Sequence, residues 1–108
     1  MSTSTTMDVD TIIARADRDF PALYQLFGGY FHEDWAEEHA TPDAAVRAFV
    51  AEAPREAAAA ARSELDRLLA SGLSDAALTR LLEDGFHSDH VPQRAAEWLV
   101  GVRETLGA

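Results

Sequence analysis

Apolar side chains recur at helical spacing along most of this 108-residue chain. Within the stretch 23–31 they occupy the i, i+3, i+4, i+7 and i+8 positions of one helix face: Leu23, Leu26, Phe27, Tyr30 and Phe31. Four of the nine aromatic residues lie between positions 24 and 31. Aromatic side chains bury the largest area per residue, so this helix is predicted to anchor the core.

The remaining apolar residues group into further helices that are separated by start and stop signals. Asp19, Thr41 and Ser74 are predicted N-caps, and Gly72 and Gly85 are predicted helix ends. No stretch alternates apolar and polar residues over the length of a strand. The prediction is therefore an all-α fold, a compact bundle of five or six short helices. The predicted helices span approximately 8–16, 21–31, 42–53, 54–71, 75–85 and 92–106, the last opened by Pro92.

The pattern also predicts what lies between and before the helices. The link 32–40 is acidic and is expected to contain a helical turn, while 86–91 is expected to be a polar loop. Residues 1–7 are predicted to be a disordered tail, because the first six are mostly Ser and Thr and offer little to bury. Residues 8–108 are predicted to form one domain.

The pair Gly28-Gly29 interrupts the aromatic stretch. Each glycine costs about 1 kcal/mol relative to alanine inside a helix. Two explanations remain open from the sequence: the pair ends the helix, or it lets another backbone approach closely.

Composition adds a strong charge. Nineteen acids and nine bases give a net charge of −10, and every base is arginine. Residues 7–43 contain nine acids and two arginines, a balance of −7, whereas residues 44–108 contain ten acids and seven arginines, a balance of −3. Such a surface repels phosphate backbones and favours a basic protein partner over nucleic acid. No transmembrane stretch and no signal-peptide pattern is found, so a cytoplasmic protein without membrane contact is expected.

Candidate chemistry is sparse. Two links share the string Phe-His-x-Asp, at 31–34 and at 86–89. Histidine and carboxylate can bind transition metals, but position 36 is Ala where a zincin helix needs its second His. Clustered acids on a short link are more typical of a solvated face than of acid–base catalysis. Cysteine is absent, and no phosphate loop or nucleophile elbow is found. We therefore predict no metal, no cofactor and no enzymatic activity.

The stretch from Phe20 to Trp35 resembles the immunity proteins of bacterial contact-dependent growth inhibition systems. The resemblance continues more weakly through 41–53 and 68–82, and covers roughly 20–106. The residues that carry it most clearly are Phe27, Gly28, Gly29, Tyr30, Phe31, His32, Asp34 and Trp35. Glu33 departs from the family pattern, in which Gln is frequent at that place, and the region after Leu82 diverges. The shared residues are expected to be architectural.

This resemblance implies a protein that binds a cognate toxin domain and neutralises it by blocking the active site or substrate groove of the toxin. The toxin domains that such proteins neutralise include ribonucleases. A basic toxin and a monomeric inhibitor are expected. Acids steer a basic partner, and aromatic residues are frequent hot spots. The second interpretation is an acidic helical regulator that binds another protein or itself, for instance as a homodimer through an exposed Trp35. The third is a metal enzyme that uses His and carboxylate ligands. The predicted partner-binding residues are Glu33, Asp34, Trp35, Glu37, Glu38 and His39.

Overall fold

A computed structural model describes residues 9–107, and within this range the chain contains helices and no strand. The all-α prediction is confirmed. The expected tail at 1–7, and the expected helix start at residue 8, lie outside the described residues. The elements are α1 (Val9–Ala14), α2 (Ala16–Asp19), α3 (Pro21–Tyr30), α4 (Trp35–Glu38), α5 (Pro42–Glu52), α6 (Arg55–Ala70), α7 (Asp75–Arg80), the π-helical turn η1 (Leu81–Gly85) and α8 (Ala95–Gly107).

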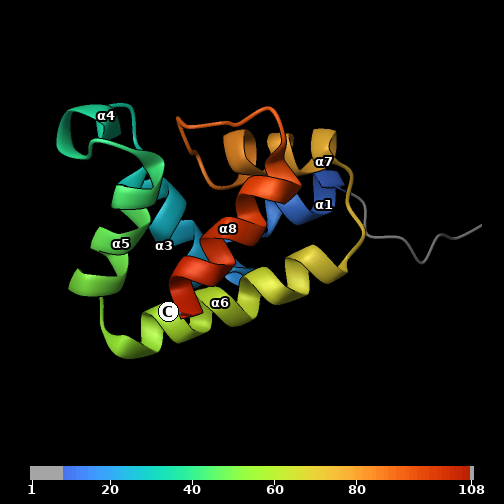
Figure 1. The fold of residues 1–108 in the computed structure, drawn as a ribbon. Coiled ribbons are helices and arrows are strands. Elements are labelled where there is room, and N and C mark those ends of the chain that lie inside the picture. The colour runs from blue at the N-terminus through green and yellow to red at the C-terminus, as the bar shows by residue number, and fades with distance from the viewer. Residues whose placement is uncertain (1–8, 108) are drawn as a thin grey trace, which may run out of the picture.

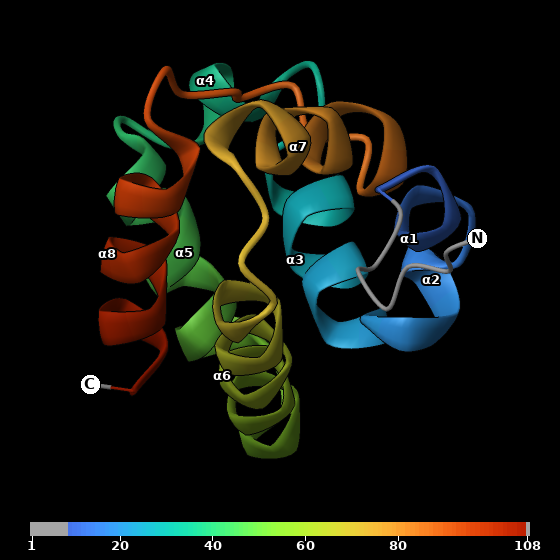
Figure 2. The same ribbon diagram turned by 90° about the vertical axis from the view of Figure 1, so that its right-hand side faces the viewer.

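The longest helix, α6, lies along one side of the molecule, and α3 and α8 pack on it (Figure 1). Helix α5 packs beside α8, α7 contacts α1 and α8, and η1 contacts α1 and α2. Figure 2 shows that α4 and α7 lie at the end of the molecule away from the start of α6. None of the helices among residues 9–107 is long and apolar enough to cross a membrane.

The predicted aromatic stripe forms the centre of the core. Leu23, Leu26, Phe27 and Phe31 are fully buried, and Tyr30 packs against the core while remaining partly exposed. Phe86 joins them, with its ring centroid 5.4 Å from that of Phe27. Burial of one such side chain stabilises the fold by roughly 1.5–3 kcal/mol.

The start of α3 differs from the prediction. Asp19 was expected to cap this helix, but it ends α2, and Phe20 occupies the N-cap position without a side-chain hydrogen bond. The cap comes from Glu64 in the middle of α6. Its carboxylate accepts hydrogen bonds from the backbone N–H of Ala22 (3.0 Å) and of Leu23 (3.0 Å). Glu64 is only 7% exposed. The acid is buried because the free N–H groups at a helix start satisfy it.

A distant acid also determines the start of α8. Pro92 was expected to open this helix, but α8 begins at Ala95. The carboxylate of Asp75, at the start of α7, accepts a hydrogen bond from the backbone N–H of Ala96 at 2.9 Å. Residues 92–94 therefore belong to the preceding loop, and the prediction of a helix from 92 was wrong.

Other helix ends follow the sequence signals more closely. The side chains of Thr41 and Ser74 accept hydrogen bonds from the N–H three residues on, which confirms both N-caps. Gly72 has a φ of +79°, as expected of a glycine after a helix. The helix predicted over 8–16 is interrupted at Arg15. The helix predicted over 75–85 changes from α to π geometry at Leu81.

The Gly28-Gly29 pair does not end the helix, since α3 continues to Tyr30. A Cβ added to Gly28 would lie 3.0 Å from the backbone oxygen of Phe86, whereas one added to Gly29 would meet nothing within 4 Å. Close backbone approach is therefore the correct explanation for Gly28. The loop after η1 crosses α3 at this glycine.

Candidate functional site

The two Phe-His-x-Asp strings lie in loops that meet in space. The backbone N–H of Asp89 donates a hydrogen bond to the carbonyl oxygen of Phe31 at 2.6 Å. The second loop is held from the other side as well, because the N–H of Ser88 donates to the carbonyl of Leu82 at 2.8 Å. Phe86 and Ser88 are buried. The segment 86–91 is a loop, as predicted, but it is anchored to the core by two buried side chains.

An aromatic cluster fills the space between these loops. The ring of His90 lies 5.8 Å from Phe31, 5.3 Å from Trp35 and 5.0 Å from Trp98, measured between centroids. Trp35 also contacts Phe31, at 5.5 Å. Trp35 is half-buried and packs against the core. It is therefore not the exposed ring that the alternative of a homodimer through Trp35 assumed.

The other predicted site residues that carry a ring make local contacts. His32 Nδ1 accepts from the backbone N–H of Asp34 at 3.1 Å, and His32 Nε2 lies 3.1 Å from a carboxylate oxygen of Glu38. His39 stacks on Tyr30, with 6.1 Å between the ring centroids.

Tyr30 ties this region to α5. Its hydroxyl donates to the carboxylate of Glu52 at 2.8 Å. Burial raises the pKa of the Tyr30 hydroxyl above its usual range, and the hydrogen bond to Glu52 and the negative charge of that residue raise it further. The aromatic residues of the motif thus hold α3, α4 and α5 together.

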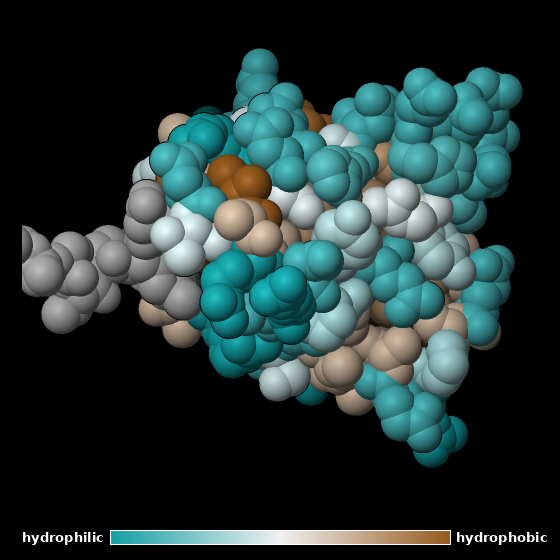
Figure 3. Space-filling view, turned by 180° about the vertical axis from the view of Figure 1, so that it is seen from behind, coloured by the Kyte–Doolittle hydropathy of each residue, from teal (hydrophilic) through white to brown (hydrophobic). Residues whose placement is uncertain are grey.

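The carboxylates around this framework face solvent. Glu33, Asp34, Glu37 and Glu38 are all exposed, and Asp89 is exposed beside them on the second loop. We call these five residues the acidic end. Segments 32–40 and 86–91 contain no arginine. Figure 3 shows, from behind, hydrophilic side chains that project at the corner formed by α4.

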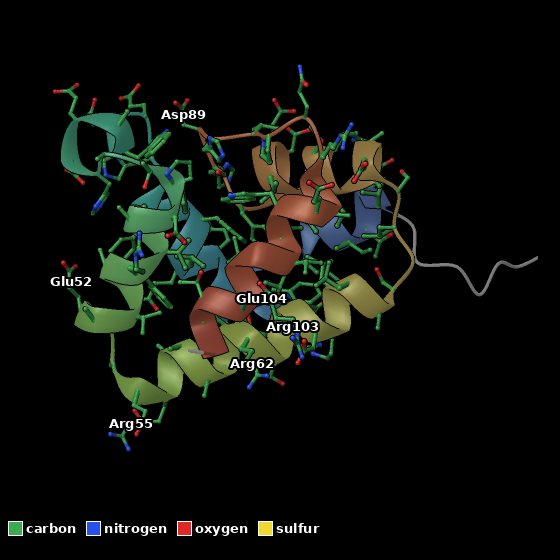
Figure 4. All side chains as sticks on the ribbon, in the orientation of Figure 1. Glu52, Arg55, Arg62, Asp89, Arg103 and Glu104 are labelled. Carbon is green, nitrogen blue, oxygen red and sulfur yellow. The ribbon has the colours of Figure 1, made fainter. Side chains whose placement is uncertain are left out.

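Several arginines lie far from the acidic end. Figure 4 shows Arg55, Arg62 and Arg103 along α6 and its contact with α8, far from Asp89. Arg103 pairs with Asp66, so part of this charge is neutralised within the fold. The negative charge is therefore unevenly distributed, and the acidic end is the part of the described surface where carboxylates stand without arginine neighbours in the sequence.

Among residues 9–107 no group of three or more His and acidic side chains is arranged to hold a metal ion. The histidines make ring contacts with aromatic side chains, and His32 also accepts a hydrogen bond within the first loop. What the site offers is a rigid platform that presents carboxylates, which is suited to binding a basic surface.

His90 is the part of the platform that should respond to pH. Burial lowers the pKa of its imidazole below 6.5, and the neighbouring charge of Asp89 opposes this effect only in part. The unfolded chain therefore binds a proton at a higher pH than the folded chain does. The free energy of unfolding should decrease as the pH falls from about 6.5 to the pKa of His90 in the folded chain. Below that pKa this contribution should no longer change.

The measurement is the midpoint of urea unfolding at pH 7.5 and at pH 5.5, and the difference between the two midpoints reports the pH dependence of stability. His90→Gln should flatten this dependence, because the titrating group is removed. His87→Asn is the matched control: His87 is exposed, has a φ of +58°, and asparagine tolerates that conformation. An unchanged slope in His90→Gln would contradict the assignment.

The sequence analysis missed the contact between His90 and Trp98, and it missed Asp89 as part of the acidic surface. The repeated Phe-His-x-Asp string was the signal, because both copies end on an exposed acid beside a buried phenylalanine. Only the fold shows that the copies are neighbours.

Comparison with known proteins identifies relatives of this arrangement. A family model described as CdiI immunity protein matches residues 19–106. One chain of a crystal structure described as the CdiA-CT/CdiI complex from Y. kristensenii 33638 has the same fold, with a TM-score of 0.77 and 24% sequence identity over 82% of this chain and 99% of that chain. No protein with a curated description matches.

Proposed function

Because the chain belongs to the CdiI immunity protein family, we propose that it binds a cognate toxin C-terminal domain inside the cell and neutralises it by occupying its active site or substrate groove. The protein acts by stoichiometric binding and not by catalysis. The family match over residues 19–106 is the observation that carries this proposal. The presence of a chain of the same fold in the CdiA-CT/CdiI complex supports it.

The toxin is further proposed to be a nuclease with a basic cleft. A cleft that binds a phosphate backbone needs positive charge. The acidic end would compete for that charge with Glu33, Asp34, Glu37, Glu38 and Asp89. Trp35 and His39 would contribute by holding the acids in place, since their rings pack against Phe31 and Tyr30.

Coexpression tests the function. The toxin domain should be sought immediately upstream of this gene and expressed from an inducible promoter, with and without this chain. We expect growth to be rescued and a one-to-one complex to be isolated. If both proteins fold and neither rescue nor a complex is observed, the proposal is wrong.

The acids on and before α4 should govern the rate of association. Neutralising Glu33, Asp34, Glu37 and Glu38 together, to Gln or Asn, should slow association roughly tenfold or more at low salt and change dissociation less. Long-range steering depends on charge, while short contacts at the rim contribute little. Stopped-flow kinetics over a salt series measures both rates.

The matched control neutralises two exposed acids outside this end, in the double variant Asp17→Asn, Glu56→Gln. Per charge removed, it should slow association less than the α4 variant does. An unchanged salt dependence of the association rate in the α4 variant would show that these acids do not steer the toxin.

A further inference from the structure

A groove runs between α5 and α8, which lie side by side (Figure 1). It consists of two adjoining hollows of about 400 Å³ and 660 Å³, both bordered by Asp43 and Gly101. The first hollow is lined largely by apolar side chains from both helices and the preceding loop: Val46, Pro92, Trp98 and Val102. Val50 and Ala51 continue this lining into the second.

The packing of the fold does not require a glycine at position 101, which borders both hollows. It lies in the middle of α8 and is exposed, and a Cβ added to it would meet nothing within 4 Å. Gly28 and Gly85 are different, since an added Cβ would come within 3.0 Å or less of a neighbouring atom. A glycine inside a helix makes that helix less stable than an alanine at the same position would. Gly101 therefore leaves free space at the border of the two hollows.

The groove adjoins the acidic end. Trp98 lines the first hollow and also contacts Phe31 and His90 in the aromatic cluster. Pro92, on the wall of the same hollow, lies in the loop that carries Asp89. A partly apolar depression beside a charged rim is the usual anatomy of a protein-binding surface.

The charges along the groove also favour a basic occupant. Arg47 pairs with Asp43 at 2.6 Å, and Arg94 lies 3.7 Å from Glu97, so both arginines that border the groove have an acidic neighbour. Glu104 borders the second hollow and adds a third acid against the two arginines. The three acids and two arginines that border the groove give it a net charge of −1, and the five carboxylates of the acidic end lie next to it.

We propose that the α5–α8 groove receives an apolar or aromatic side chain of the toxin domain, flanked on the toxin by basic residues that face the acidic end. This inference rests on the proposed function and adds where the binding energy is concentrated. The acidic end sets the rate of encounter, and the groove sets the lifetime of the complex. Buried side chains at the centre of an interface dominate affinity, while rim charges mainly affect association.

Filling the groove tests the inference. Gly101→Phe places a ring in the space now open, and we expect it to raise the Kd for the toxin domain at least tenfold, mainly through faster dissociation. Val100→Phe is the matched control, because Val100 is the adjacent residue on α8, is 46% exposed and does not line the groove. Its Kd should equal that of the wild type within a factor of about two. Biolayer interferometry with the immobilised toxin domain measures both.

The outcomes separate the two proposals. If the wild type does not bind the toxin, the proposed function fails. If the wild type and Gly101→Phe bind equally well, the function stands and the groove inference is wrong. Should Gly101→Phe fail to fold by circular dichroism, Ala51→Trp, which enters the groove from α5, decides instead. If the wild type is a dimer in sizing chromatography and only groove-filling variants are monomers, the occupant is a second copy, and the inference is overturned.

Discussion

Replacing Glu64 by alanine should lower the free energy of unfolding by about 3 kcal/mol, more than any change to a surface acid. The carboxylate accepts from the N–H groups of Ala22 and Leu23 at the start of α3 and is almost completely buried. Its removal leaves two buried donors without a partner. Each unsatisfied buried group costs about 1–3 kcal/mol, and the loss of the favourable charge at the helix start adds to this.

Two further variants test whether the loss of stability comes from the cap. Glu64→Gln retains one acceptor oxygen but loses the charge, so its loss should be intermediate. Glu56→Ala removes an exposed acid from the first turn of the same helix and should cost no more than about 0.5 kcal/mol. Urea unfolding monitored by circular dichroism measures all three. A loss in Glu64→Ala equal to that in Glu56→Ala would show that α3 does not depend on this cap.

Local signals predicted much of the fold. The stripe from Leu23 to Phe31 was read correctly because helical spacing reports which side chains share a face. Thr41 and Ser74 were read correctly because an N-cap and its N–H are only three residues apart. Each of these features is determined within one or two helical turns.

The errors arose where a helix end depends on a distant residue. Glu64 is 42 residues from Ala22, and Asp75 is 21 residues from Ala96. Glu64 shares the apolar face of α6 with Ala61 and Leu68, but helical spacing does not report which helix start an acid caps. Asp19 and Pro92 were plausible starts by sequence alone, yet the distant carboxylates fixed α3 and α8 differently.

The site follows the same division. The acids at positions 33–38 could be predicted as a charged surface from the sequence, since a dense run of acids is solvated. Asp89 and the cluster of His90 with Trp98 could not, because they meet the first loop only after α3, η1 and α8 have packed. The aromatic residues of the motif therefore pack as structural support, and the acids beside them are exposed.

The contact between α3 and the second loop is the most sensitive part of this support, and Gly28→Val should lower the free energy of unfolding by about 2–3 kcal/mol. A Cβ at this position would already lie 3.0 Å from the backbone oxygen of Phe86, and a branched side chain adds further atoms there. Overpacking of a well-packed contact typically costs 1–3 kcal/mol. Phe86 is fully buried against Phe20 and Phe27, so the loop cannot easily retreat.

Gly29→Val is the control that the chain itself provides, because a Cβ on the next residue meets nothing within 4 Å. Valine and glycine have similar helix propensities, so its stability should stay within about 0.5 kcal/mol of the wild type. The difference in the free energy of unfolding between the two variants separates the cost of the close backbone contact at Gly28 from the effect of helix propensity. Equal losses would mean that the loop yields freely. In that case Asp89 would not be held to Phe31 as firmly as a preformed binding surface requires, and the steering effect should fall mainly on the acids of α4.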